Sequence, residues 1–247
     1  MPDAMITALP SRLFDLVCPG YCLVCGGSDQ RRLICQACTT RLTSLCYQAC
    51  PRCAAPQPPY GLPCSFCRAG CYEFEKANAL GLYHGLLRDT VLAAKRPGLG
   101  PLAYGIGQLL AEVFAEQLAL ESYCLITAAP VHWRRRLRRG FNGAELIMRG
   151  IQSRLEIPAR HGLIVHQRLT LKQSTLSADH RHGNVKGAFG IRPGHDLAGQ
   201  RVLLLDDVMT TGATASELSR VLLRAGATRV DLLVVARGLP AAPRQQS

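Results

Sequence analysis

Short aliphatic runs alternate with amphipathic segments over the C-terminal two thirds of the chain. The runs predict strands over residues 80–83, 123–129, 162–165, 201–207 and 230–236. Apolar residues at helical spacing predict helices over residues 86–95, 102–120, 143–155 and 215–225. Alternating strands and helices indicate right-handed β-α-β crossovers. We therefore expect an α/β fold with a mainly parallel sheet flanked by helices.

The aliphatic run 202–205 suits a central strand that is covered on both faces. Two adjacent carboxylates, Asp206 and Asp207, follow it directly. Because like charges at a strand end repel each other, they need partners such as sugar hydroxyls or a hydrated Mg²⁺. The pair is the first indication of a ligand site.

A hydroxyl-rich glycine turn, Thr-Thr-Gly-Ala-Thr at 210–214, separates the carboxylates from the helix predicted at 215–225. Gly212 allows the backbone to approach a ligand closely. A phosphate at the helix start would meet free N–H groups and the positive end of the helix dipole. The alternative is an ordinary connection, since Thr214 and Glu217 match a T-x-x-E capping box.

Five arginines follow the strand predicted at 123–129, namely Arg134, Arg135, Arg136, Arg138 and Arg139. Guanidinium groups suit pyrophosphate and phosphodiester oxygens. Ligands bind beyond the carboxyl ends of strands in open α/β folds, which favours a binding role over a solvated basic face. Residues 168–189 are polar, basic and long for a loop, which predicts a mobile flap.

The chain has 29 Lys and Arg residues against 17 Asp and Glu residues, a net charge of +12. This excess indicates an anionic partner, such as phosphates, nucleic acid or a lipid surface. No apolar run approaches the roughly 20 residues of a membrane span, and the N-terminus lacks a signal-peptide pattern. We therefore expect a cytoplasmic protein. Cys124 lies in an apolar run and is expected to be a buried thiol.

Eleven of the twelve cysteines lie between Cys18 and Cys71. They include four C-x-x-C pairs: Cys22/Cys25, Cys35/Cys38, Cys50/Cys53 and Cys64/Cys67. Two pairs complete a tetrahedral Cys₄ site, so sequential pairing gives two small ribbons with structural zinc. Crossed pairing or a single site are the alternatives. A reducing compartment disfavours disulfides, and the regular spacing disfavours an iron–sulfur cluster. Cys18, Cys46 and Cys71 remain as substitute ligands.

The stretch D-D-V-M-T-T-G-A-T at 206–214 resembles the phosphoribosyl pyrophosphate (PRPP) loop of type I phosphoribosyltransferases. The resemblance implies that Asp206 and Asp207 bind the ribose hydroxyls of PRPP, together with Mg²⁺. It implies that the 5′-phosphate is bound by Thr210, Thr211, Gly212, Ala213 and Thr214. It further implies that the arginine run binds pyrophosphate.

Nearly the whole chain resembles the ComF/GntX family, on the C-x-x-C pairs, R-G-F-N at 139–142, and Gln173 with R-x-x-N-V-x-G-A-F at 181–189. Gly143 departs from the glutamine that usually follows R-G-F-N in that family. The resemblance implies a double zinc ribbon at 1–75 and a phosphoribosyltransferase domain at 76–240. It also implies a flexible closing loop with Gln173, Arg181, Asn184 and Lys186. The Pro-, Ala- and Gln-rich composition after Arg237 predicts a frayed tail at 241–247.

Thr210 stands where the similar 6-oxopurine phosphoribosyltransferases carry an aspartate near the purine. A threonine cannot act as that base at neutral pH, so ordinary hypoxanthine or guanine salvage is not expected. No residue identifies itself as a general base for an acceptor. The catalytic residues, the acceptor and the oligomeric state are therefore left open.

The ComF resemblance implies a role in natural competence, with single-stranded DNA and DNA-uptake proteins as partners. The first hypothesis is a PRPP-dependent phosphoribosyltransferase with an unknown acceptor. The alternative is a non-enzymatic factor that binds single-stranded nucleic acid, since electrostatic grooves bind single strands. A PRPP-sensing regulator on the same scaffold ranks last.

Overall fold

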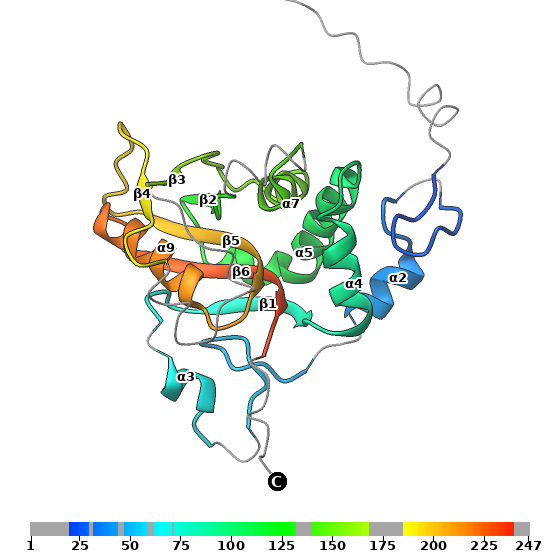
Figure 1. Cartoon of the computed structure of the whole chain (residues 1–247), viewed down its shortest axis with the longest axis horizontal. Helices are drawn as coiled ribbons and strands as arrows, with labels where there is room; N and C mark the ends of the chain where they lie inside the picture. Colours follow the sequence, from blue (N-terminus) through cyan, green and yellow to red (C-terminus); the bar gives the residue numbers. More distant parts are fainter. Residues whose placement is uncertain are drawn as a thin grey trace, which may run out of the picture.

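The computed structural model describes residues 20–29, 32–43, 47–58, 62–70, 72–131, 140–167 and 185–239 (Figure 1). Its main sheet is parallel and has the strand order β1-β6-β5-β2. These strands are β1 (Ala77–Leu82), β6 (Arg229–Arg237), β5 (Arg201–Met209) and β2 (Leu125–Ala128). A separate antiparallel pair consists of β3 (Ile164–His166) and β4 (Phe189–Ile191). The predicted α/β class is confirmed.

Helices cover both faces of the sheet. One face carries α4 (Gly85–Ala93), α5 (Gly100–Leu120) and α7 (Gly143–Gln152), and the other carries α9 (Ala213–Arg224) together with β3 and β4 (Figure 1). Two short helices, α2 (Gln36–Thr43) and α3 (Ser65–Ala69), belong to the cysteine-rich part. Each predicted helix corresponds to one observed helix, with ends that differ by at most three residues.

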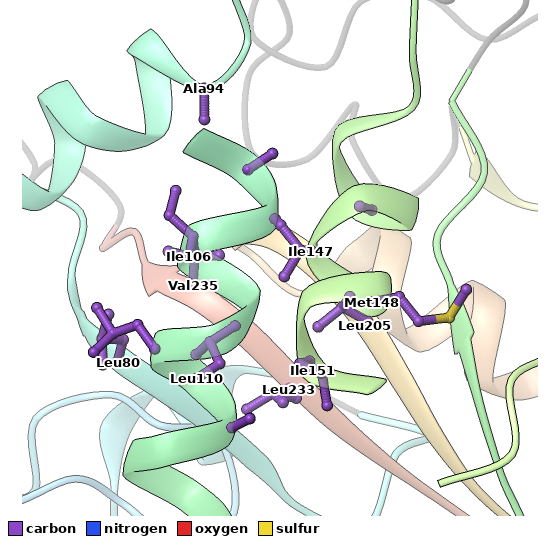
Figure 2. Close-up of a cluster of buried hydrophobic side chains, with 14 of the residues drawn as sticks. Leu80, Ala94, Ile106, Leu110, Ile147, Met148, Ile151, Leu205, Leu233 and Val235 are labelled. Carbon is purple, nitrogen blue, oxygen red and sulfur yellow. The ribbon is translucent and has the colours of Figure 1, made fainter. Parts of the chain in front are cut away.

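The two cores follow the alternation of side chains along the central strands. Leu205, Leu233 and Val235 pack with α5 and α7, as the close-up in Figure 2 shows. The intervening residues Val202 and Leu204 point to the other face and pack against α9. Because successive side chains of a strand point in opposite directions, an unbroken aliphatic run fills both cores. The prediction that 202–205 is a central strand is confirmed.

The boundaries that differ from the predicted ones include the start of β1 and the end of the flap. β1 starts at Ala77, three residues early, because Ala77 to Ala79 carry little strand preference and pair with β6 only in the folded chain. The predicted flap also ends too late, since Val185 and Ala188 are buried and Phe189 begins β4. Its remaining residues, 168–184, lie outside the described residues. The domain boundaries stay predictions.

Cys124 contradicts its prediction, because it is exposed beside the start of β5, where its sulfur accepts from the Arg201 N–H at 3.5 Å. It precedes β2 at the end of a loop, so the apolar run does not bury it. Among the helices that the structure describes, none combines the length and apolar character of a membrane span.

Helices α5 and α7 cross at a point where two glycines face each other. A methyl group on Gly107 would lie 2.0 Å from the Ile147 carbonyl oxygen, and one on Gly150 would lie 2.1 Å from the Tyr104 carbonyl oxygen. The backbone atoms of a helix cannot shift enough on their own to accommodate contacts this short, so the two helices would have to separate. The glycines therefore set how closely α7 approaches α5, and α7 in turn covers the end of the sheet where β2 lies.

We expect Gly107→Ala to lower the free energy of unfolding by about 2–3 kcal/mol, because the added methyl group forces the two helices apart. Urea unfolding followed by circular dichroism measures this. Gly143→Ala is the matched control, since its methyl group meets no atom within 4 Å at the start of α7. Equal stability of the two variants would contradict the close crossing.

Candidate functional site

The carboxyl ends of β2 and β5 lie side by side at one edge of the sheet. β2 ends at Ala128, which pairs with Leu205, and the Ala129 N–H donates to the Leu205 carbonyl at 2.8 Å. Asp206 and Asp207 therefore lie immediately past the end of the neighbouring strand. The segment that leads from β2 to the arginine run starts at the same level. This is the edge at which open parallel sheets bind ligands.

The two carboxylates belong to β5 itself, which pairs with β6 as far as Met209. Consecutive residues of a strand point to opposite faces, so Asp206 and Asp207 diverge. Asp207 lies on the α4 side, where its Oδ2 is 2.7 Å from the Nζ of Lys95. Lys95 follows α4, whereas the sequence pattern predicts it only as the last residue of a helix. The sequence feature that could have identified Lys95 as a site residue is its position as a basic residue after the first predicted strand and helix.

Asp206 has an unusual protonation equilibrium. Burial and the adjacent charge of Asp207 raise the pKa of Asp206 to about 7, against the lowering effect of the Asp207 N–H and of Lys95. The Asp207 N–H donates to the Asp206 Oδ1 at 2.8 Å. A carboxyl with a pKa near neutrality can bind a hydroxyl-rich or cationic ligand with release of a proton.

The turn after β5 begins α9 without a side-chain cap. Gly212 is the N-cap residue with a φ of +80°, and no side chain accepts a hydrogen bond in the capping position. Among the described residues, the acceptor of the Ala213 N–H is the Thr211 hydroxyl at 3.4 Å. Thr210, Thr211 and Thr214 are partly exposed around these amides. An uncapped helix start with hydroxyls beside it suits a phosphate.

The capping-box alternative is wrong. Thr214 is the second residue of α9 rather than its cap. The Glu217 carboxylate is directed elsewhere, because its Oε1 accepts from the Gly187 N–H at 2.7 Å and its Oε2 accepts from the Arg220 Nε at 2.8 Å. Burial opposes ionisation of Glu217, but these donors keep its pKa below the usual value. Glu217 thus attaches the segment before β4 to α9.

The four C-x-x-C pairs form two tetrads. Within each tetrad all sulfurs lie within 4.8 Å of one another; the first tetrad is Cys22, Cys25, Cys35 and Cys38, and the second is Cys50, Cys53, Cys64 and Cys67. Sequential pairing is therefore the observed arrangement. The Sγ atoms of Cys53 and Cys64 are 3.7 Å apart, as are those of Cys50 and Cys67. Metal–sulfur bonds of about 2.3 Å in a tetrahedron place sulfurs about 3.8 Å apart, so both tetrads could bind zinc.

The pKa values of the cysteine thiols are also consistent with a bound cation in each tetrad. Burial raises the pKa of Cys22, but N–H donors from Cys35, Cys25 and Val24 outweigh burial and leave it at about 6. Burial raises the pKa of Cys53 to about 11. Four thiols this close cannot all ionise unless a positive ion compensates their charge, and a zinc ion in each tetrad would supply that charge.

Comparisons with known proteins agree with this arrangement. Residues 159–246 match the family model of the phosphoribosyl transferase domain. The chain is 28% identical to DNA utilization protein YhgH of Escherichia coli, over 91% of this chain and 100% of that protein. It is 26% identical to competence protein F of Haemophilus influenzae, over 87% of this chain and 96% of that protein. The chain is a homologue of the ComF proteins.

This ComF homologue is also 23% identical to competence protein ComFC of Bacillus subtilis, over 78% of this chain and 79% of that protein. A hypoxanthine phosphoribosyltransferase from Staphylococcus aureus superposes with a TM-score of 0.37 at 13% identity, over 56% of this chain and 75% of that one. So low a score adds nothing to the description of the site. The parallel sheet, the domain match and the tetrads agree with the fold class implied by the ComF resemblance.

The structure brings only part of the predicted site together. The carboxylates and the turn at 210–214 lie on one continuous strand, turn and helix start. Lys186 is exposed and adjoins Gly187, which is bonded to α9 through Glu217. Outside the described residues lie Arg134, Arg135, Arg136, Arg138, Arg139, Gln173, Arg181 and Asn184. The same holds for Cys18, Cys46 and Cys71.

We expect two zinc ions per chain, one in each tetrad. Elemental analysis of freshly purified protein measures the metal content. Cys35→Ser and Cys64→Ser, which remove the third ligand of the first and second tetrad, should each reduce the content to about one ion, since a tetrahedral zinc site needs four ligands. Wild-type protein with near-zero zinc, or with iron in its place, would contradict the assignment.

Proposed function

We propose that this ComF homologue binds PRPP with Mg²⁺ at the carboxyl edge of β5, as a phosphoribosyltransferase-type protein that handles single-stranded DNA during its uptake. One observation carries the ligand: a single strand, turn and helix start joins two adjacent carboxylates to an uncapped helix N-terminus. Carboxylates accept hydrogen bonds from ribose hydroxyls, and the helix start donates N–H groups to a phosphate. Ribose 5-phosphate has both groups at its two ends.

The residues take separate roles in this proposal. Asp206 and Asp207 hold the ribose hydroxyls, while Thr210, Thr211 and Thr214 surround the 5′-phosphate. Lys95 holds Asp207 in place through the 2.7 Å ion pair. A Mg²⁺ ion bound together with PRPP would supply positive charge to the pyrophosphate group. Arg134, Arg135, Arg136, Arg138 and Arg139 follow the adjacent strand β2 and add charge from the protein.

A transfer reaction would break the bond between ribose C1 and pyrophosphate through a cation-like transition state. The chain would contribute placement and neutralisation of charge rather than a covalent intermediate. The loop carrying Gln173, Arg181, Asn184 and Lys186 would close over the donor and exclude water. Lys186 already adjoins the segment that Glu217 attaches to α9. No described residue identifies itself as a base for the acceptor.

A role with DNA rests on the relatives and on charge. The Escherichia coli relative is named for DNA utilization and the Haemophilus influenzae relative for competence. The net charge of +12 favours a phosphate-rich partner. The second candidate function is a non-enzymatic factor that binds single-stranded nucleic acid. Pyrophosphate release from PRPP with one particular acceptor supports the transferase, whereas salt-sensitive single-strand binding without release supports the factor.

We expect wild-type protein to bind PRPP in the presence of Mg²⁺, and the Asp206→Asn/Asp207→Asn double variant to bind about 100-fold more weakly or worse, because two charged acceptors are lost. Isothermal calorimetry measures both affinities. Asp89→Asn is the control, since it removes an exposed carboxylate on α4. Absence of binding by the wild type would overturn the proposal.

PRPP affinity should rise about tenfold between pH 6 and pH 8, since the Asp206 carboxyl, whose pKa is about 7, must ionise to accept from ribose hydroxyls. Asp206→Asn should remove this part of the pH dependence, which separates it from titration of the ligand's own phosphates. A raised carboxyl pKa stabilises the folded state at low pH, and that contribution is lost as the pH rises through about 7. Asp206→Asn should therefore raise the melting temperature at pH 8 more than at pH 5. An unchanged pH profile in the variant would refute the assignment.

A further inference from the structure

The second tetrad lies against the turn at 210–214, whereas the first does not contribute to that region. Residues of the first tetrad, Cys22 and Cys38, belong to the core with α4 and α5. Cys50 and Cys53 of the second tetrad form a separate small core, against which Tyr72 packs. Tyr72 also reaches the turn, because a methyl group on Gly212 would lie 2.6 Å from its ring. The αL residue of the turn therefore rests on an aromatic ring from the second tetrad's core.

Arg237 joins the same two regions from the other side. It ends β6, is 1% exposed, and its Nε donates to the carbonyl of the metal-ligand candidate Cys53 at 3.0 Å. Its Nη1 donates to the Met209 carbonyl at 3.0 Å and also to the Thr210 carbonyl. The Arg237 guanidinium thus fixes the position of Cys53 relative to Met209 and Thr210, where the turn begins.

The charge of Arg237 makes this link depend on the metal centre. Among the described residues its acceptors are carbonyl oxygens, and no carboxylate lies within ion-pair distance. Its guanidinium lies 5.6 Å from the centre of the Phe66 ring, which stands between Cys64 and Cys67 in sequence. Four thiolates around one Zn²⁺ carry a net charge of about −2. A loaded second tetrad therefore supplies the negative charge that a buried arginine requires.

A third contact connects the tetrad's core to α9. The Glu73 N–H donates to the Ser216 Oγ at 3.1 Å, one turn inside the helix. Arg52, between Cys50 and Cys53, donates to the Tyr72 carbonyl at 2.9 Å and so supports the segment that makes both contacts. The turn at 210–214 is thus contacted at Gly212, at Thr210 and behind the first turn of its helix.

We propose that Arg237 is a positioning residue, through which the metal-loaded second tetrad sets the geometry of the PRPP loop (residues 206–214). The inference rests on the proposed function of that loop. It adds that PRPP binding depends on metal in the second tetrad, which lies outside the loop. The first tetrad serves the stability of the α4 and α5 side and has no such effect. Loss of metal from the second tetrad alone then weakens PRPP binding.

Calorimetry with PRPP and Mg²⁺ on the full chain compares Cys64→Ser with Cys35→Ser, which remove the third ligand of the second and first tetrad. We expect Cys64→Ser to weaken PRPP binding by about tenfold or more, in the usual range of coupling between sites, and Cys35→Ser to change it by less than about threefold. Equal effects of the two substitutions, or normal binding by Cys64→Ser, would overturn the inference. Failure of the wild type to bind PRPP would instead remove the proposed function.

A second measurement avoids substituting a cysteine of a tetrad, because such a substitution could unfold the cysteine-rich part. The full chain is reconstituted with Co²⁺, whose thiolate absorption reports the geometry of the tetrads. Saturating PRPP and Mg²⁺ should shift this absorption, since coupling between two sites is reciprocal. Arg237→Lys, which keeps the charge but loses the fork of donors, should reduce the shift and weaken PRPP binding. An unchanged cobalt spectrum, while calorimetry shows PRPP binding, would contradict the role of Arg237.

Discussion

Burial of β5 on both faces is the constraint on which the rest of the structure depends. Val202 to Leu205 are 0% exposed, with α5 and α7 on one side and α9 on the other. A strand enclosed in this way can present polar groups only at its ends. Asp206 and Asp207 appear at the point where the neighbouring strand β2 has ended. The position of the site follows from the same burial that stabilises the sheet.

The site itself is electrostatically unfavourable without a ligand. Two carboxylates are adjacent, Lys95 pairs with Asp207, and burial raises the pKa of Asp206 to about 7. The following helix start has no side-chain cap. The adjacent carboxylates and the helix start without a side-chain cap cost stability in the free protein, and the ion pair of Lys95 with Asp207 offsets part of that cost. The PRPP ligand that we propose would relieve the rest. Such local departures from the most stable choice are typical of binding sites.

The two tetrads resemble each other in sequence but differ in their surroundings. The first contributes Cys22 and Cys38 to the core with α4 and α5, and Arg32 beside it pairs loosely with Glu112 of α5 at 3.7 Å. The second surrounds a small core of its own, and that core touches Gly212 through Tyr72. Two tetrads of the same composition therefore have different surroundings, because one lies beside the helices and the other beside the turn after β5.

The sequence by itself determined the features that depend on residues close together along the chain. The period of apolar positions predicted the strands and helices, the C-x-x-C spacing predicted thiolate ligands, and the stretch 206–214 predicted a ribose phosphate site. Only the tertiary structure decided which pairs of cysteines combine, that Glu217 binds Gly187 instead of capping α9, and that Lys95 meets Asp207. It also placed Arg237 on Cys53, 184 residues away in sequence. Local patterns record the backbone and the burial of each segment, whereas the partner of a buried charge is chosen by how distant segments pack.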